Sequence, residues 1–97
     1  MAISGNRQSA TVAAVPAPTT VANLLTANST RGGFIITNGT TGNLFVKFGA
    51  TATTTDYTIK LAAGAVYEAQ PLGNELYGGL ITGIIDTGTG NVQVTSW

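Results

Sequence analysis

The strongest candidates for chemistry in this sequence are the residues of an Asp-Thr-Gly triplet, Asp86-Thr87-Gly88, which directly follows two isoleucines. Two such aspartates, brought together across a two-fold axis, can share one proton and catalyse the hydrolysis of a peptide bond. That chemistry needs further strands after the aspartate to build a substrate cleft, and here the chain leaves room for one turn and one strand. The sequence therefore favours a structural role, in which Asp86 ends a strand and accepts backbone hydrogen bonds in a tight turn.

The remaining carboxylates give weaker signals for catalysis. Glu68 and Glu75 can be imagined as the acid and the nucleophile of a glycosidase, but a loop separates them and fixes no distance between the carboxyl groups. Asp56 stands in a threonine-rich segment and is no stronger a candidate, while a Ca²⁺ ion near Asp86 stays open as an alternative. The sequence has no His and no Cys, which excludes Ser-His-Asp triads, cysteine nucleophiles and zinc sites built from these residues. We expect a protein that is not an enzyme and holds no cofactor or metal.

Charge is scarce in this chain of 97 residues, which is long enough for one domain. Four Lys and Arg residues balance four Asp and Glu residues, so the charged fraction is only 8% and the formal net charge is zero. Four basic residues are too few for the row of phosphate contacts that nucleic-acid binding requires. Because near-zero net charge promotes association, we expect a subunit of a larger assembly.

The N-terminal region lacks charge from Gln8 to Thr30. Its prolines and polar residues exclude a membrane helix, and its start lacks the pattern of a secretory signal, which predicts synthesis in the cytoplasm. We expect residues 1–20 to form an extended arm, either disordered when alone or packed on a neighbouring subunit, with an edge strand as an option at 11–15. The residues expected to contact another subunit or a capsid are Val12, Val15, Pro16, Pro18 and the C-terminal Trp97.

The rest of the chain, residues 21–97, reads as one β-domain. Short runs of β-branched and aromatic residues alternate with turns rich in Gly, Asn and Thr, which is typical of an all-β antiparallel sandwich or small barrel. We expect about six or seven strands, at 20–26, 34–37, 44–48, 57–61, 65–68, 80–86 and 92–97. The loop at 38–43 is expected to join its two neighbours as a hairpin, and Leu44, Val46 and Phe48 to share one face of their strand.

Three aromatic residues, Tyr67, Tyr77 and Trp97, are the least tied to strand interiors. A row of exposed aromatic rings can stack on sugars, so a carbohydrate-binding surface is one hypothesis for them. Aromatic residues of this kind more often lie at the margin of a core or in a protein interface, which is the competing interpretation.

Four segments together resemble a group of small virion proteins of tailed bacteriophages. The segments are Arg31–Asn38, Asn43–Gly49, the Y-T-x-x-L-x-x-G-x-x-Y-E run at Tyr57–Glu68, and Gly78–Ile84 with its I-T-G-I sequence. The resemblance covers residues 31–97 and points to capsid decoration (cement) proteins and, in places, to modules of tail or fibre proteins.

The resemblance implies a structural protein on the capsid surface of a virion. Such a protein clamps neighbouring copies of the major capsid protein, and threefold sites on a capsid would make it a homotrimer. We therefore expect the major capsid protein and further copies of this chain as partners, and neither nucleic acid nor membrane. The alternative is a tail-fibre or tail-associated β-module that binds glycans on the host surface.

Overall fold

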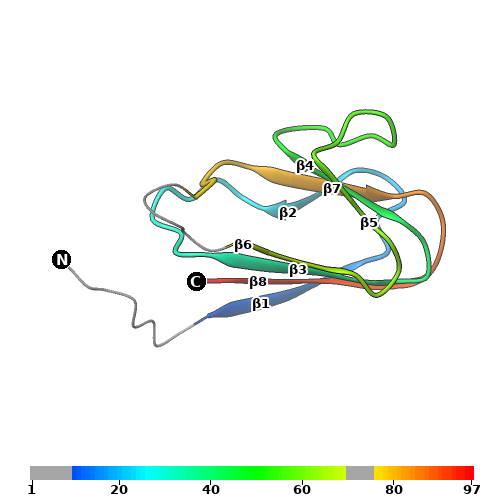
Figure 1. Ribbon diagram of the computed structural model, residues 1–97, viewed down its shortest axis with the longest axis horizontal. Coiled ribbons are helices and arrows are strands. Elements are labelled where there is room, and N and C mark those ends of the chain that lie inside the picture. The colour runs from blue at the N-terminus through cyan, green and yellow to red at the C-terminus, as the bar shows by residue number, and fades with distance from the viewer. Residues whose placement is uncertain (1–9, 70–75) are drawn as a thin grey trace.

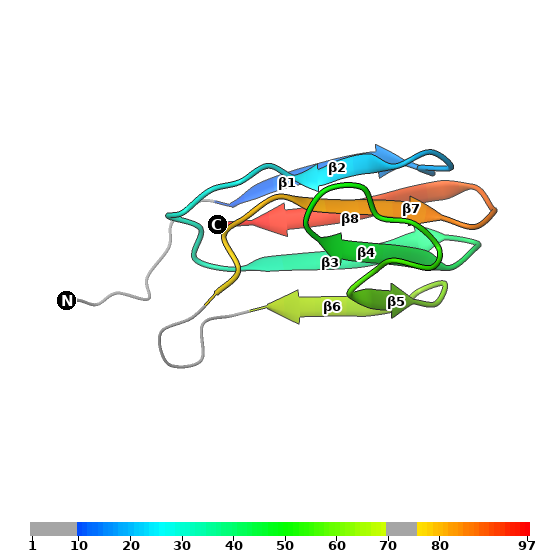
Figure 2. The same ribbon diagram turned by 90° about the horizontal axis from the view of Figure 1, so that it is seen from above.

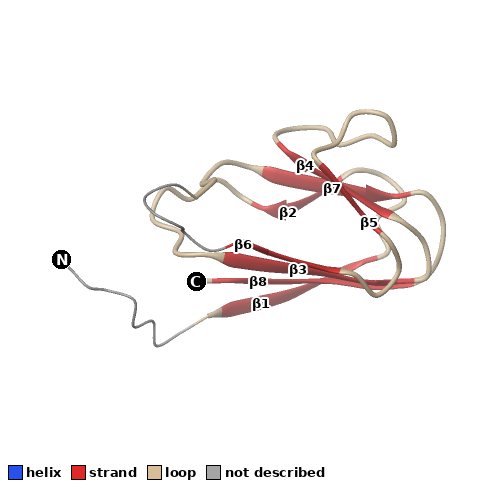
Figure 3. Cartoon of the chain, viewed as in Figure 1, coloured by secondary structure: helices blue, strands red, loops and turns tan. Residues whose placement is uncertain are grey.

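The computed structural model describes residues 10–69 and 76–97, which form eight strands and no helix (Figures 1 and 3). The all-β prediction is confirmed, with one strand more than the expected six or seven. The strands are β1 (Thr11–Pro16), β2 (Ala22–Leu25), β3 (Phe34–Thr40), β4 (Leu44–Phe48), β5 (Ile59–Leu61), β6 (Val66–Ala69), β7 (Ile81–Ile85) and β8 (Gly90–Ser96).

The strands form two antiparallel four-stranded sheets. The first sheet has the order β1-β8-β3-β6 and the second has the order β2-β7-β4-β5. The two sheets stack face to face, so that each strand of one sheet lies over a strand of the other (Figures 1 and 2). Strands that follow one another in the chain change sheet at every connection except β4 to β5. Eight strands wound in this order form a jelly roll, a variety of the two-sheet sandwich expected from the sequence.

The predicted hairpin around residues 38–43 is wrong. β3 pairs with β6 and β8 in the first sheet, whereas β4 pairs with β5 and β7 in the second. The segment between β3 and β4 therefore crosses from one sheet to the other. A hairpin and such a crossover have the same local signal, a Gly-rich and Asn-rich turn between two β-branched runs. They differ in tertiary structure: the two strands of a hairpin pair in one sheet, whereas the two strands joined by a crossover are buried against one another in different sheets.

The core lies between the sheets and follows the alternation of the strands. Leu44 and Val46 are fully buried and Phe48 packs against the same cluster, as expected for one face of β4. Phe45 points to the outer side of the second sheet, where the ring of Tyr57 covers it at 5.0 Å between centroids. The buried apolar residues of the core are Leu24, Phe34, Ile36, Leu44, Val46, Leu61, Ile81, Ile85, Val92 and Val94.

The described part of the N-terminal region, from residue 10 onward, belongs to the β-domain. β1 pairs along its whole length with β8 of the same chain, from Thr11 opposite Ser96 to Pro16 opposite Asn91. Residues 11–16 are thus an edge strand of the first sheet and not part of a separate arm, in agreement with the edge strand that the sequence allows at 11–15. Residues 1–9 lie outside the described residues.

Four of the sheet-to-sheet connections meet at one end of the sandwich, at the right in Figure 1, which we call the crossover end. They are residues 17–21, 41–43, 62–65 and 86–89. Backbone hydrogen bonds tie them to the rest of the fold: Ile85 N–H donates to the carbonyl of Pro18 (2.9 Å), and Thr41 N–H donates to that of Thr89 (2.9 Å). This end therefore depends on close approach between loops far apart in the sequence.

Candidate interaction surface

Asp86, the strongest candidate for chemistry, is a structural clamp at the crossover end. Its Oδ1 accepts hydrogen bonds from the backbone N–H groups of Asn43 (2.9 Å) and Thr87 (2.7 Å), and its Oδ2 accepts one from Asn43 Nδ2 (3.0 Å). The bond from the Asn43 backbone is the largest of the causes that hold the pKa of the Asp86 carboxyl below its usual value. Both oxygens thus face N–H donors, which compete with a cation, and the turn-closing role predicted from the sequence is confirmed.

Asp86 should make stability fall in acid. A carboxyl whose pKa is lowered by folding contributes stability that is present above its unfolded pKa and is lost as the pH falls through the folded one. We expect the urea midpoint to fall as the pH is lowered below about 4, the usual pKa of an aspartate, and the fall to be smaller for Asp86→Asn. Asn43→Ala, which removes one donor, should also reduce the fall, and an unchanged pH profile in both variants would contradict this role.

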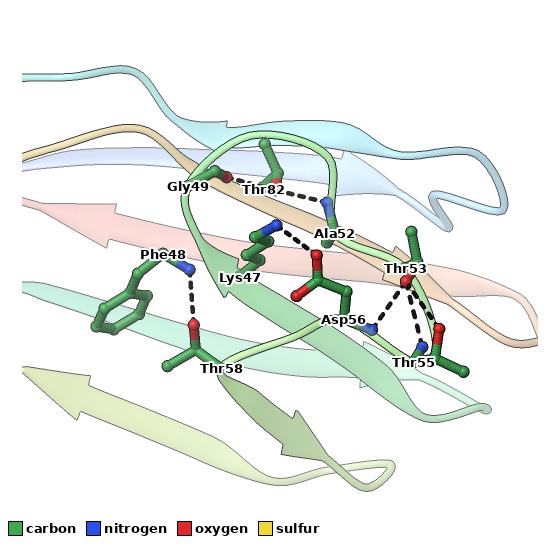
Figure 4. Close-up of polar contacts among 9 residues, drawn as sticks. All are labelled: Lys47, Phe48, Gly49, Ala52, Thr53, Thr55, Asp56, Thr58 and Thr82. Carbon is green, nitrogen blue, oxygen red and sulfur yellow. Dashed lines mark hydrogen bonds and ion pairs between the residues drawn. The ribbon is translucent and has the colours of Figure 1, made fainter.

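The other acidic candidates do not assemble into a site in the described part of the chain. Glu68 lies on β6, and its suggested partner Glu75 lies outside the described residues, so the pair has no measured separation. Asp56 pairs with Lys47 at 2.6 Å in the loop between β4 and β5 (Figure 4). Within residues 10–69 and 76–97, no group of three or more acidic residues is placed to hold a metal ion.

The loop at 49–58 is fixed to the second sheet by its threonines, as Figure 4 shows. The Thr82 hydroxyl on β7 donates to the carbonyl of Gly49 (2.8 Å) and accepts from the N–H of Ala52 (3.0 Å). Thr53 Oγ1 accepts from the N–H of Asp56 (2.8 Å), which closes the turn at the tip. The hydroxyl groups of these threonines therefore serve the loop itself.

The aromatic residues considered for sugar binding are occupied within the fold. Tyr77 stacks on Phe48 with ring centroids 4.8 Å apart, and its hydroxyl donates to the carbonyl of Leu80 (2.9 Å). Tyr67 packs between Phe34 and Phe48, at 6.0 and 6.1 Å. These rings form one cluster at the margin of the core and present no open row to a sugar.

Arg31 is a buried cation whose role no local sequence pattern indicates. Its guanidinium donates to the carbonyls of Thr26 (2.6 Å) and Tyr77 (2.9 Å), and it lies 5.5 Å from the centre of the Phe34 ring. Burial lowers the pKa of this group, and the interaction with Tyr77 opposes the shift. Arg31 therefore joins segments of the chain at the end opposite the crossovers.

The surface that remains is the outer side of the first sheet, which we call the outer face. The strand register places its side chains in two rows that cross all four strands. The rows are Val12-Thr95-Ile35-Glu68 and Ala14-Gln93-Thr37-Val66. Val12 is 65% exposed and Val66 is 56% exposed, and Glu68 is the one ionisable side chain in the two rows. Exposed apolar side chains on a nearly neutral surface are typical of an interaction site.

The five residues expected to contact a partner do not share one surface. Val12 and Pro16 are exposed, and their strand positions place both on the outer face, whereas Val15 points inward and packs against the core. Pro18 is buried within its own chain, so it is not exposed to a partner as expected. Trp97 is partly buried, and its ring lies so close to Gly33 that a Cβ there would approach it to 2.5 Å.

The sequence predictions missed Ile35 and Val66 as members of the candidate surface. Alternation along each strand indicates which side chains point outward, but the register between strands is needed to bring them into one row. The described residues contain no helix long and apolar enough to cross a membrane. In comparisons with known proteins, no family model, no curated protein and no solved structure matches the chain.

Proposed function

We propose that this chain is a structural protein of a bacteriophage virion, a decoration protein that cements neighbouring major capsid proteins on the head surface. The observation that carries the proposal is the outer face, whose two rows hold two strongly exposed valines and a single charge. A nearly neutral face loses little hydration energy when it is covered, so it suits a contact that is permanent.

Several charged groups elsewhere in the described residues support a role without chemistry. Asp86 closes a turn, Asp56 pairs with Lys47, and the buried cation Arg31 is bound to backbone carbonyls. These charged groups hold the fold together and do not converge on a cleft. Jelly rolls serve in viral capsids and also in lectins, so the fold is compatible with the proposal by analogy and does not decide it.

The alternative, a tail-associated module that binds glycans, needs aromatic rings open to solvent. Tyr67 and Tyr77 pack against Phe48 instead, and Trp97 packs on Gly33. Among residues 10–69 and 76–97 no specific contact favours this alternative, so we retain the cement role. Homotrimer formation stays a prediction within the proposal, to be measured by sedimentation of the purified protein.

The test is incorporation into particles, with Val66→Lys as the informative variant. The wild-type chain should appear by mass spectrometry in purified particles of the phage that encodes it, and should rebind to particles stripped of it. Val66→Lys replaces an exposed apolar side chain on the outer face by a hydrated charge and should weaken rebinding at least about tenfold. The matched control is Val21→Lys, because Val21 is 42% exposed but lies in the connection between β1 and β2.

Three results would count against the proposal. Particles that lack the polypeptide would exclude a virion protein. Particles that contain it but rebind Val66→Lys as tightly as wild type would exclude the outer face as the contact. A specific signal on a glycan array, without binding to particles, would favour the tail-associated alternative.

A further inference from the structure

We propose that the open edge of β1 pairs antiparallel with β1 of a second copy of this chain, so that two first sheets join into one sheet of eight strands. β1 stands at the end of the order β1-β8-β3-β6, and no strand of the described residues pairs with its other side. The inference rests on the fold and on no property of a capsid, so it can fail or hold independently of the proposed function.

The hydrogen bonds of β1 alternate between β8 and the open side. Ala17 N–H donates to the carbonyl of Gly90 at 2.8 Å, and these residues continue the register in which Pro16 lies opposite Asn91. In an antiparallel pair, bonded and non-bonded positions alternate along the strand. The backbone groups of the odd-numbered residues therefore bond to β8. Those of the even-numbered residues point away from β8, in the plane of the sheet, toward the open edge. The open edge thus offers the N–H and C=O groups of Val12 and Ala14 and the C=O of Pro16.

The proline of β1 fits this assignment. Pro16 has no N–H, and it occupies an even position, where β8 requires no donor. Exposed edges are usually protected by charged side chains, bulges or a covering loop. β1 carries no charged residue, and Thr11 to Ala14 are exposed on both sides of the strand. Apart from the proline at its end, the described residues give this edge none of the features that prevent pairing.

When a second copy of β1 is placed by a two-fold axis through Ala13, the hydrogen-bonding groups of the two open edges pair with one another. Val12 then lies opposite Ala14 of the partner subunit, and Ala10 lies opposite Pro16 of the partner subunit. All outward N–H groups from Ala10 to Pro16 find a carbonyl, which gives about six hydrogen bonds across the axis. Ala13 faces its own equivalent in a non-bonded position, where a small side chain allows the close approach of the strands.

A second copy fits the edge better than the other candidate occupants. An acidic or basic peptide would find no opposite charge on β1, whereas β1 meets itself without repulsion. The other open edge of the first sheet, β6, has four residues and carries Glu68, so it offers β1 a shorter and charged partner. A two-fold contact uses the same edge on both subunits, so it is complete in a pair of chains. In a trimeric cement protein, this contact would join one chain to a chain of a neighbouring trimer.

The pairing is expected to be weak in dilute solution. Two edge strands bury less than the roughly 1,200 Å² that stable complexes need, so the contact depends on a high local concentration such as assembled neighbours provide. A covalent trap detects it at ordinary protein concentrations, and the chain is suited to this because it contains no cysteine.

The test is disulfide trapping with single-cysteine variants of the full chain under mild oxidation. Two Cα atoms in a non-bonded antiparallel position are about 4.5 Å apart, within the range that a disulfide spans. Ala13→Cys should therefore form a covalent dimer. Val12→Cys alone should not, because the two copies of residue 12 are then about 8–9 Å apart, but a mixture of Val12→Cys and Ala14→Cys chains should cross-link.

Two controls separate pairing from random collision and from misfolding. Thr54→Cys places a thiol on the exposed loop of the second sheet, and it should give at most about a tenth of the Ala13→Cys yield. Adding Ala14→Pro to Ala13→Cys removes an outward N–H without touching the bonds to β8, and should lower the yield about tenfold at an unchanged urea midpoint. Equal yields for the Ala13 and Thr54 cysteines, or cross-linking of Val12→Cys alone, would overturn the proposal.

Discussion

Replacing Asn38 by alanine should lower the free energy of unfolding by about 3–5 kcal/mol, one of the two largest effects that we expect. Asn38 is fully buried at the crossover end. Its Nδ2 donates to the carbonyls of Gly42 (2.9 Å) and Leu61 (2.8 Å), and its Oδ1 accepts from the N–H (3.0 Å) and the hydroxyl (2.6 Å) of Thr40. The shorter side chain leaves buried backbone groups without partners, and each costs about 1–3 kcal/mol.

Urea unfolding at neutral pH measures this effect as a shift of the midpoint at constant slope. A loss of this size is a large fraction of the roughly 5–15 kcal/mol that holds a domain together. Asn23→Ala is the matched control, because Asn23 is exposed on β2, and it should change stability by less than about 1 kcal/mol. Asn38→Asp keeps the acceptor oxygens but loses both donors. A well-tolerated Asn38→Asp would show that the bonds to Gly42 and Leu61 are not what holds this end together.

The second large effect is expected from Gly42→Ala, with a loss of about 3 kcal/mol. Gly42 lies between β3 and β4, where the chain crosses from one sheet to the other. A Cβ at this position would overlap the carbonyl oxygen of Thr87 and lie 2.7 Å from Asp86 Oδ1. Because the obstacle is backbone, two loops have to move apart, and the hydrogen bonds from Asn43 to Asp86 would be stretched with them.

Gly64→Ala is the control that separates this steric cost from backbone strain. Gly64 has a φ of +82° and nothing within 4 Å of a Cβ, so alanine there meets strain without a clash. We expect that variant to lose about 1 kcal/mol, clearly less than Gly42→Ala in the same urea measurement. Equal losses would show that the close approach to Thr87 does not limit this position.

Both predictions concern the crossover end, and neither position was singled out from the sequence. Asn38 reads as a turn residue beside Gly39, because asparagine and glycine are common in exposed turns. In the structure β3 continues through it to Thr40, and its side chain lies between the two sheets. A buried asparagine is tolerated only where its donors and acceptors find partners, and those partners come from Gly42 and from Leu61 on β5.

The local features of this protein were determined by its sequence alone. The approximate strand positions, the inward face of β4 and the turn at Asp86 depend on side-chain period and turn chemistry within a few residues. All three are confirmed, although the ends of several strands differ from the predicted ones, as in β3, which continues to Thr40. The candidate surface was predictable only in part. The sequence indicates which side chains of each strand point outward, but not which of them lie side by side on neighbouring strands.

The tertiary structure decided which strands are neighbours. The pairing of β1 with β8, the separation of β3 from β4 and the rows of the outer face join residues far apart in the chain. Such pairings are selected by how well two sheets bury their apolar faces together and satisfy the polar groups trapped between them. That balance belongs to the whole fold, so a segment read in isolation carries the tendency to form a strand but not the identity of its partner.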